Sequence, residues 1–123
     1  MGAPFVEIYF ENSNRYWNQA QEHLKRKELA KASELAWGSV AEAIKALAAT
    51  TGHMVKGHRE VRSYIKIVSG QLQDPELYEY FKEVERLHVN FYETHLDEDD
   101  IRGALSKAHV LLSKLRELIQ RDY

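Results

Sequence analysis

Apolar residues recur at helical spacing between Glu28 and Thr51, where they return every three or four positions. This spacing places them on one face of a helix, and they are Leu29, Ala32, Ala36, Val40, Ala43, Ile44 and Leu47. The many alanines favour a helix and permit a neighbouring helix to pack closely. Gly52 follows, and glycine readily adopts the left-handed conformation that ends many helices. The pattern therefore predicts a helix over 28–51.

Three further helices follow from the same period. After a loop, one helix is predicted over His58–Gln71. Asp74-Pro75-Glu76 is typical of a helix start, because it combines an N-cap acid, a proline in the first turn and an acid facing the helix dipole. The helix that begins there, which is the fourth along the chain when the first segment is counted, is predicted to reach about Phe91. The acidic run 97–100 is a second start, and it precedes an apolar seam typical of a bundle, formed by Ile101, Leu105, Ala108, Leu112, Leu115 and Ile119.

The first segment, roughly Pro4–Arg26, leaves two interpretations open. Residues at helical spacing favour a helix, and they are Tyr16, Trp17, Ala20 and Leu24. The stretch Phe5–Phe10 can also be interpreted as a short strand, and no Gly or Pro marks the junction with the next helix. We predict an all-α fold as a single domain over residues 1–123, with five helices in an antiparallel bundle and the short third helix as an irregular element.

The composition is that of a globular chain of 123 residues and 14.3 kDa. With 44% hydrophobic and 29% charged residues, the sequence is not that of a disordered chain. It contains no Cys, which excludes disulfides, thiolate metal sites and cysteine nucleophiles. No apolar run approaches the ~20 residues of a membrane-spanning helix, and no signal-peptide pattern is present. We therefore expect a cytoplasmic protein that does not associate with membranes.

Charge is unevenly distributed along the chain, although the net charge is only −2. That total excludes a generally basic coat for nucleic acid. Two segments, 23–31 and 53–66, are nevertheless basic, since each holds four Lys or Arg against one Glu. Basic loops that precede a helix can bind phosphates, but such segments are also typical of a solvated face. His58, Arg59 and Arg62 are therefore candidate phosphate ligands.

A second candidate site lies near the end of the fourth predicted helix. Arg86, His88, Asn90 and Tyr92 could bind a phosphate or a base edge, or they could satisfy the carbonyls at the helix end. The Glu-x-x-His pattern that ends at His88 also matches half of a di-metal carboxylate site, but such a site needs a second pair. The chain has no second pair, so we predict no metal and no cofactor.

Two blocks, Ala32–Gly38 and Leu87–Glu93, carry a resemblance to a known family. They read Ala-Ser-Glu-x-x-Trp-Gly and Leu-His-x-Asn-Phe-Tyr-Glu. With these blocks and Gly57-His58, the chain resembles the archaeal PaREP family, grouped with the HEPN class of helical bundles, over about residues 14–120. The resemblance implies an up-and-down four-helix core with an extra short helix, and a homodimer. It brings no established activity.

The resemblance also directs attention to a ribonuclease motif. HEPN ribonucleases typically carry Arg-x(4–6)-His, often extended to His-x-Tyr, before the final helix. Tyr92 fits this pattern, whereas Asn90 stands in place of the His, and Arg86 lies four residues before it. His88 is two residues out of step, which is about 200° around a helix. Since an Asn side chain cannot transfer a proton as His does, the departure disfavours ribonuclease activity.

These observations predict a non-catalytic module that binds RNA or a nucleotide and acts as a homodimer. An alternative is a metal-independent ribonuclease of the toxin type, with His88 and Tyr92 as catalytic candidates and an Arg from the same chain or its partner. A third is a role as the interaction partner of a nucleotidyltransferase, which the HEPN resemblance implies. Trp37 and Tyr64 are expected in the core or at a subunit interface, because large rings at helical spacing usually pack.

Overall fold

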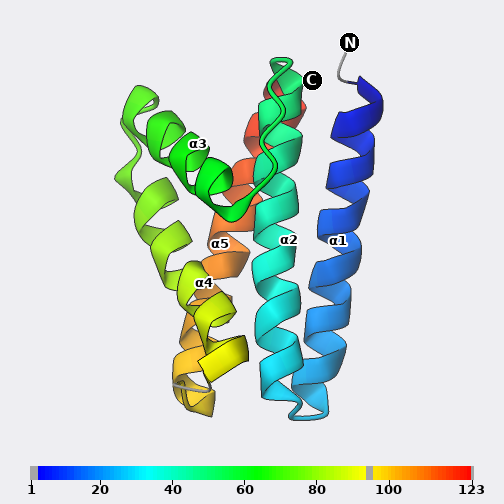
Figure 1. Ribbon diagram of the computed structural model, residues 1–123, viewed down its shortest axis with the longest axis vertical. Coiled ribbons are helices and arrows are strands. Elements are labelled where there is room, and N and C mark those ends of the chain that lie inside the picture. The colour runs from blue at the N-terminus through cyan, green and yellow to red at the C-terminus, as the bar shows by residue number, and fades with distance from the viewer. Residues whose placement is uncertain (1–2, 94–95, 123) are drawn as a thin grey trace.

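Five helices form the part of the chain that the structure describes. The computed structural model describes residues 3–93 and 96–122, and of residues 3 and 90–93 it describes the backbone alone. The helices are α1 (Ala3–Lys25), α2 (Leu29–Thr50), α3 (His58–Gln71), α4 (Pro75–Glu93) and α5 (Glu98–Asp122). Helices α1, α2, α4 and α5 run alternately down and up, and the shorter α3 is tilted beside α4 (Figure 1). The predicted all-α fold, with a short additional helix, is confirmed.

The first segment is helical from Ala3 to Lys25, so the alternative of a strand over Phe5–Phe10 is wrong. An isolated strand would leave its backbone N–H and C=O groups without partners, and the described residues contain no other strand to pair with it. A helix satisfies these groups internally. Within this stretch Val6 is buried, while Phe5 and Ile8 remain exposed.

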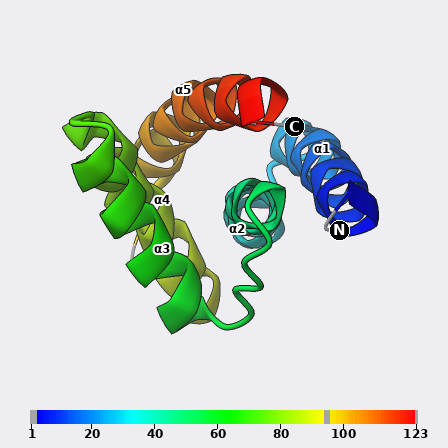
Figure 2. The same ribbon diagram turned by 90° about the horizontal axis from the view of Figure 1, so that it is seen from above.

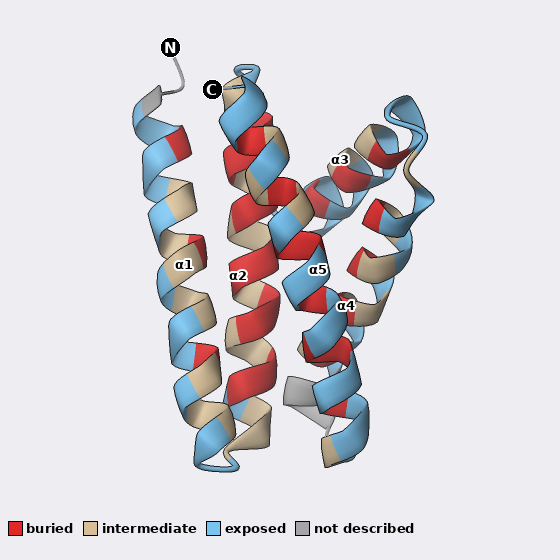
Figure 3. Ribbon diagram, turned by 180° about the vertical axis from the view of Figure 1, so that it is seen from behind, coloured by how far each residue is buried: buried red, intermediate tan, exposed pale blue. Residues whose placement is uncertain are grey.

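Helix α2 is the centre of the structure. Viewed from above, the other helices lie around it (Figure 2), and its backbone is close to those of α1, α3, α4 and α5. The backbone of α1, in contrast, is close to α2 alone. Twelve of the 22 residues of α2 are buried (Figure 3), and most of these are Ala or Ser. Small side chains are required there because neighbouring helices approach from nearly every side.

The large side chains of the core come mainly from α4 and α5, whose apolar stripes face α2. Their fully buried members are Leu77, Phe81, Leu87, Ile101, Leu111, Leu112, Leu115 and Ile119. These residues lie at the helical spacing expected from the sequence. The bundle therefore combines a central helix of small residues with outer helices of large ones.

The predicted helix boundaries are confirmed by the local geometry. Gly52 has a φ of 81°, the left-handed conformation expected after α2. At the start of α4, Asp74 Oδ1 accepts a hydrogen bond from the Glu76 N–H at 3.3 Å. At the start of α5, Asp97 Oδ1 accepts one from the Asp100 N–H at 2.8 Å. Both acidic starts thus bind backbone donors that the first turn of a helix leaves free.

The turn between α1 and α2 is short and contains no glycine. Lys27 adopts a φ of 58° there, a conformation that costs a non-glycine residue about 1 kcal/mol. The Glu28 N–H donates to the His23 carbonyl at 2.9 Å, and His23 Nδ1 donates to Glu28 Oε1 at 3.0 Å. This hydrogen bond is the main cause that lowers the pKa of the Glu28 carboxyl. The contacts across the turn explain why α1 ends without Gly or Pro.

Two buried serines join α1 to α2 at the point where the helices pack closely. Ser13 Oγ donates to the Ser39 carbonyl at 2.8 Å, and Ser39 Oγ donates to the Ser13 carbonyl at 2.7 Å. Both residues are buried, so each hydroxyl satisfies its hydrogen-bonding capacity within the interface. The pair occupies little volume and fixes the position of α1 along α2.

We expect Ser39→Leu to lower the free energy of unfolding by about 2 kcal/mol or more, because the larger side chain overpacks the interface and the hydrogen bond is lost. Ser113→Leu on the exposed face of α5 is the matched control and should change stability by less than about 0.5 kcal/mol. Urea unfolding followed by circular dichroism measures both values. Equal stability of the two variants would contradict close packing at Ser39.

Candidate functional site

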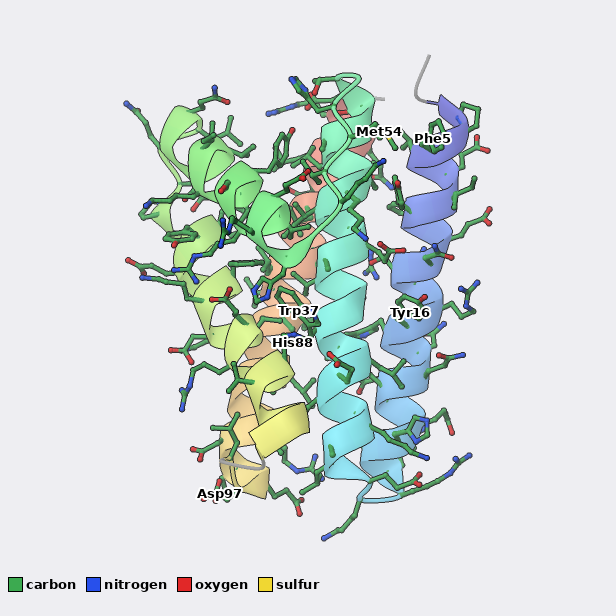
Figure 4. The ribbon with its side chains drawn as sticks, in the orientation of Figure 1. Phe5, Tyr16, Trp37, Met54, His88 and Asp97 are labelled. Carbon is green, nitrogen blue, oxygen red and sulfur yellow. The ribbon has the colours of Figure 1, made fainter. Side chains whose placement is uncertain are left out.

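Trp37 is the one aromatic residue of α2, and it lies where α3 and α4 approach that helix. Its side chain is buried, with 8% of the residue exposed. The ring centroid lies 4.8 Å from that of His58 on α3 and 5.6 Å from that of Phe81 on α4. The ring of His88 on α4 stacks on it at 5.2 Å (Figure 4). Trp37 therefore packs in the core, as expected, but its neighbours include two histidines.

Glu85 of α4 holds two basic side chains of α3 at once. His58 Nε2 donates to Glu85 Oε2, and Arg62 Nη1 donates to Glu85 Oε1, both at 2.5 Å. The Glu85 side chain is 14% exposed, whereas that of Arg62 is 45% exposed. The hydrogen bond and the negative charge of Glu85 raise the pKa of the Arg62 guanidinium. Arg62 thus remains a permanent cation that is anchored at one end and open to solvent.

His88 is held by a second carboxylate, on a different helix. His88 Nδ1 donates to Glu34 Oε1 of α2 at 2.8 Å. About a quarter of each of these side chains is exposed. The His58 and His88 rings meet edge to face, with their centroids 5.3 Å apart. Each imidazole is therefore oriented by its own carboxylate, which fixes the tautomer of the neutral ring.

Each of the three helices contributes two of these residues, spaced three or four positions apart. Residues at this spacing lie on the same face of a helix, one turn from each other. The six residues, which we name the Trp37 cluster, are Glu34 and Trp37 of α2, His58 and Arg62 of α3, and Glu85 and His88 of α4. The helix packing therefore brings three local pairs into one site.

The charge of the Trp37 cluster depends on protonation of its histidines. Two carboxylates and one guanidinium give −1 when both imidazoles are neutral and +1 when both are protonated. Paired imidazoles can donate and accept protons near neutral pH, and a guanidinium suits the planar charge of a phosphate. The arrangement can thus bind a phosphate and has the groups needed for acid–base chemistry.

The structure brings together three of the residues predicted to form a site, namely His58, Arg62 and His88. The sequence assigned them to two separate candidate sites, with His58 and Arg62 in one and His88 in the other. It weighed Glu34 and Glu85 only as carboxylates of a di-metal site that it rejected, and it expected Trp37 to pack. Their signal in the sequence is local pairing at helical spacing, and it becomes specific only when α2 and α4 are known to be neighbours.

The remaining predicted residues do not join the Trp37 cluster within the described part of the chain. Arg59 is exposed and makes no hydrogen bond or ion pair with any described residue. Arg86 Nη1 donates to Glu83 Oε2 at 3.2 Å on the exposed face of α4. The side chains of Asn90 and Tyr92 lie outside the described residues. Their proposed roles stay predictions.

The described residues contain neither a cluster of metal ligands nor a membrane-spanning helix. No group of three or more His, Asp or Glu side chains is placed there to hold a metal ion. Glu85 and His88, which match half of a di-metal pattern, bind different partners instead. None of the described helices combines the length and the apolarity needed to cross a bilayer.

Comparison with known proteins identifies both a family and a similar fold. The sequence profile of the Archaeal PaREP1/PaREP8 family matches residues 8–112. A crystal structure of a protein from Sulfolobus solfataricus superposes with a TM-score of 0.77, covering 87% of this chain and 95% of that one. The two sequences are 20% identical, so this similarity concerns the fold alone. No curated protein matches the chain.

We expect Trp37→Ala to lower the free energy of unfolding by about 3–5 kcal/mol, because it leaves a cavity between α2, α3 and α4. Trp17→Ala, on the half-buried face of α1, is the control and should cost less. Thermal and urea unfolding measure the difference. A loss below about 1 kcal/mol at Trp37 would show that the ring does not support the packing of these helices.

Proposed function

The chain belongs to the archaeal PaREP1/PaREP8 family, and on that premise we propose that it is an HEPN-like helical protein that binds RNA or a nucleotide without cleaving it. The observation that carries the proposal is the convergence of His58 and Arg62 of α3 with His88 of α4: both imidazoles pack on Trp37 of α2, and Arg62 joins them through Glu85. Arg and protonated His are effective phosphate ligands. The proposed ligand site is therefore the exposed edge of the Trp37 cluster.

The surroundings of the Trp37 cluster support an anionic ligand. On α3, Arg59 and Lys66 form no ion pair with a described carboxylate. The other basic segment, 23–31, differs because three of its cations are already paired. Those pairs are Lys25–Glu22 at 3.5 Å, Arg26–Glu28 at 3.8 Å and Lys27–Glu98 at 3.6 Å. Of the two basic segments, 53–66 therefore retains more unpaired positive charge for a ligand.

Non-catalytic binding remains the preferred function because Asn90 occupies the place of the proton-transferring His of HEPN ribonucleases. HEPN-like classification is part of the proposal, supported by the alternating helices and the short additional α3. A homodimer and a nucleotidyltransferase partner stay predictions. Phe5 and Ile8, which are exposed on α1, support an association between copies.

We expect the protein to bind short single-stranded RNA or a nucleotide at low salt, with an affinity that falls as salt rises. Arg59→Ala/Arg62→Ala should weaken binding by about tenfold or more, the loss expected for one charged hydrogen bond. Fluorescence anisotropy with labelled RNA, together with nucleotide competition, measures the affinities.

The control for this experiment is Arg15→Ala/Arg102→Ala, which removes two exposed arginines from α1 and α5. This variant should bind like the native protein. No binding at low salt would refute the proposed function.

A second candidate function is metal-independent RNA cleavage, which the two carboxylate-paired histidines favour. With centroids 5.3 Å apart, one imidazole can take the proton from a 2′-hydroxyl while its oxygen attacks phosphorus. The other can donate a proton to the departing 5′-oxygen, and Arg62 can stabilise the charge on the phosphorane. This assignment uses His58 and His88, whereas the sequence suggested His88 and Tyr92.

If the protein cleaves RNA, cleavage should persist in EDTA, produce 2′,3′-cyclic phosphate ends and fall by at least about 100-fold in His88→Ala or His58→Ala. His109→Ala, which changes an exposed histidine of α5, is the matched control. Electrophoresis of end-labelled RNA separates the products. Binding without cleavage by the native protein would exclude the enzyme and leave the preferred function intact.

A further inference from the structure

Three cations surround the ring of Tyr78 on the outer face of α3 and α4. Arg62 Cζ lies 5.6 Å from the ring centroid, Lys66 Nζ lies at 5.7 Å and Lys82 Nζ lies at 5.1 Å. Tyr78 is half-buried, and its ring stacks against that of Phe81 in the core. The ring therefore has a fixed position, and its electron-rich surface attracts the cations.

The two lysines of this group have no carboxylate to neutralise them. Neither Lys66 nor Lys82 forms an ion pair with a described residue, and both side chains are exposed. They line a depression of about 370 Å³ together with Tyr78 and Glu79, and the Glu79 carboxylate forms no ion pair with either. Lys66 and Lys82 repel each other across the Tyr78 ring, and an anion bound between them removes that repulsion.

Arg62 connects this group to the Trp37 cluster. Its guanidinium both binds Glu85 and lies over Tyr78. From His58 to Lys66, the basic side chains extend along α3 for eight residues, which is about 12 Å at 1.5 Å per residue. The phosphates of one strand rise by about 3.4 Å per nucleotide along the axis of a double helix, and the distance between neighbouring phosphates is longer than this rise. A length of about 12 Å therefore suits more than one phosphate of a strand better than one free anion.

We propose that Lys66 and Lys82, positioned by Tyr78, form a second phosphate site that binds the backbone of the RNA strand held at the Trp37 cluster. This inference rests on the proposed function and selects RNA over a single nucleotide. Lysine binds phosphate as a point charge without reading the base. The Tyr78 site, which comprises Arg62, Lys66, Tyr78 and Lys82, therefore binds RNA independently of its sequence.

The test compares Lys66→Gln/Lys82→Gln with Lys25→Gln/Lys31→Gln. Both variants remove two positive charges from exposed positions, so they have the same net charge and should both fold, as circular dichroism checks. Binding of a labelled single-stranded RNA of about ten nucleotides is measured by anisotropy over a range of salt concentrations. Loss of two phosphate contacts should reduce the slope of log K against log salt by about 1.4 in the first variant only. Changing the base sequence of the RNA should not alter this difference.

Several outcomes would overturn the inference. If the native protein binds RNA and Arg59→Ala/Arg62→Ala weakens it, but the two lysine variants behave alike, the Tyr78 site is not used and the proposed function stands. If inorganic phosphate, followed by NMR shifts of the lysine side chains, binds at Lys66 and Lys82 while RNA affinity matches the control, the ligand is a free anion. If no form of the protein binds RNA at low salt, the proposed function fails and the inference fails with it.

Discussion

The structure depends on close packing around α2. A helix with neighbours on nearly every side can be approached only if its side chains are small, and Ala and Ser make up most of its buried residues. The reciprocal serine hydrogen bonds to α1 use the same closeness, since each hydroxyl reaches a carbonyl of the facing helix. The outer helices supply the large side chains that this arrangement leaves room for. The positions of the outer helices, and of the sites between them, therefore depend on the small side chains of α2.

Trp37 is the exception to the small residues of α2, and the candidate site forms around it. A buried indole gives two imidazoles a rigid apolar surface on one side, while Glu34 and Glu85 fix them from the other. Polar groups in such a site are oriented before any ligand arrives, which lowers the cost of binding. Arg62 extends the site outward because its guanidinium is anchored to Glu85 and still open to solvent. The Trp37 side chain thus supports both the packing of the core and the preorganised polar edge of the site.

Local signals predicted the helices, whereas the site required the tertiary arrangement. The apolar stripe of 28–51, the glycine after it and the two acidic starts are properties of neighbouring residues, and the structure confirms them. The strand alternative at the first segment was wrong because nothing else in the described chain could pair with it. His58 and His88 are thirty positions apart, and Glu34 is 54 positions from its partner His88, so no spacing rule connects them. Their grouping depends on which helices are adjacent, which the sequence pattern does not specify.

The turn at Lys27 has a consequence for how two copies can associate. The backbone of α1 is close to that of α2 alone, and the short turn brings α1 back against α2 of the same chain. The loop-closure entropy of such a turn is small, so the hairpin forms within one molecule at low cost. If Lys27 left its positive φ, and Glu28 its ψ of 74°, for the ordinary helical region, α1 and α2 would join into one continuous helix. The serine contacts would then be available to a second copy, and the chain would exchange α1 in a domain-swapped dimer.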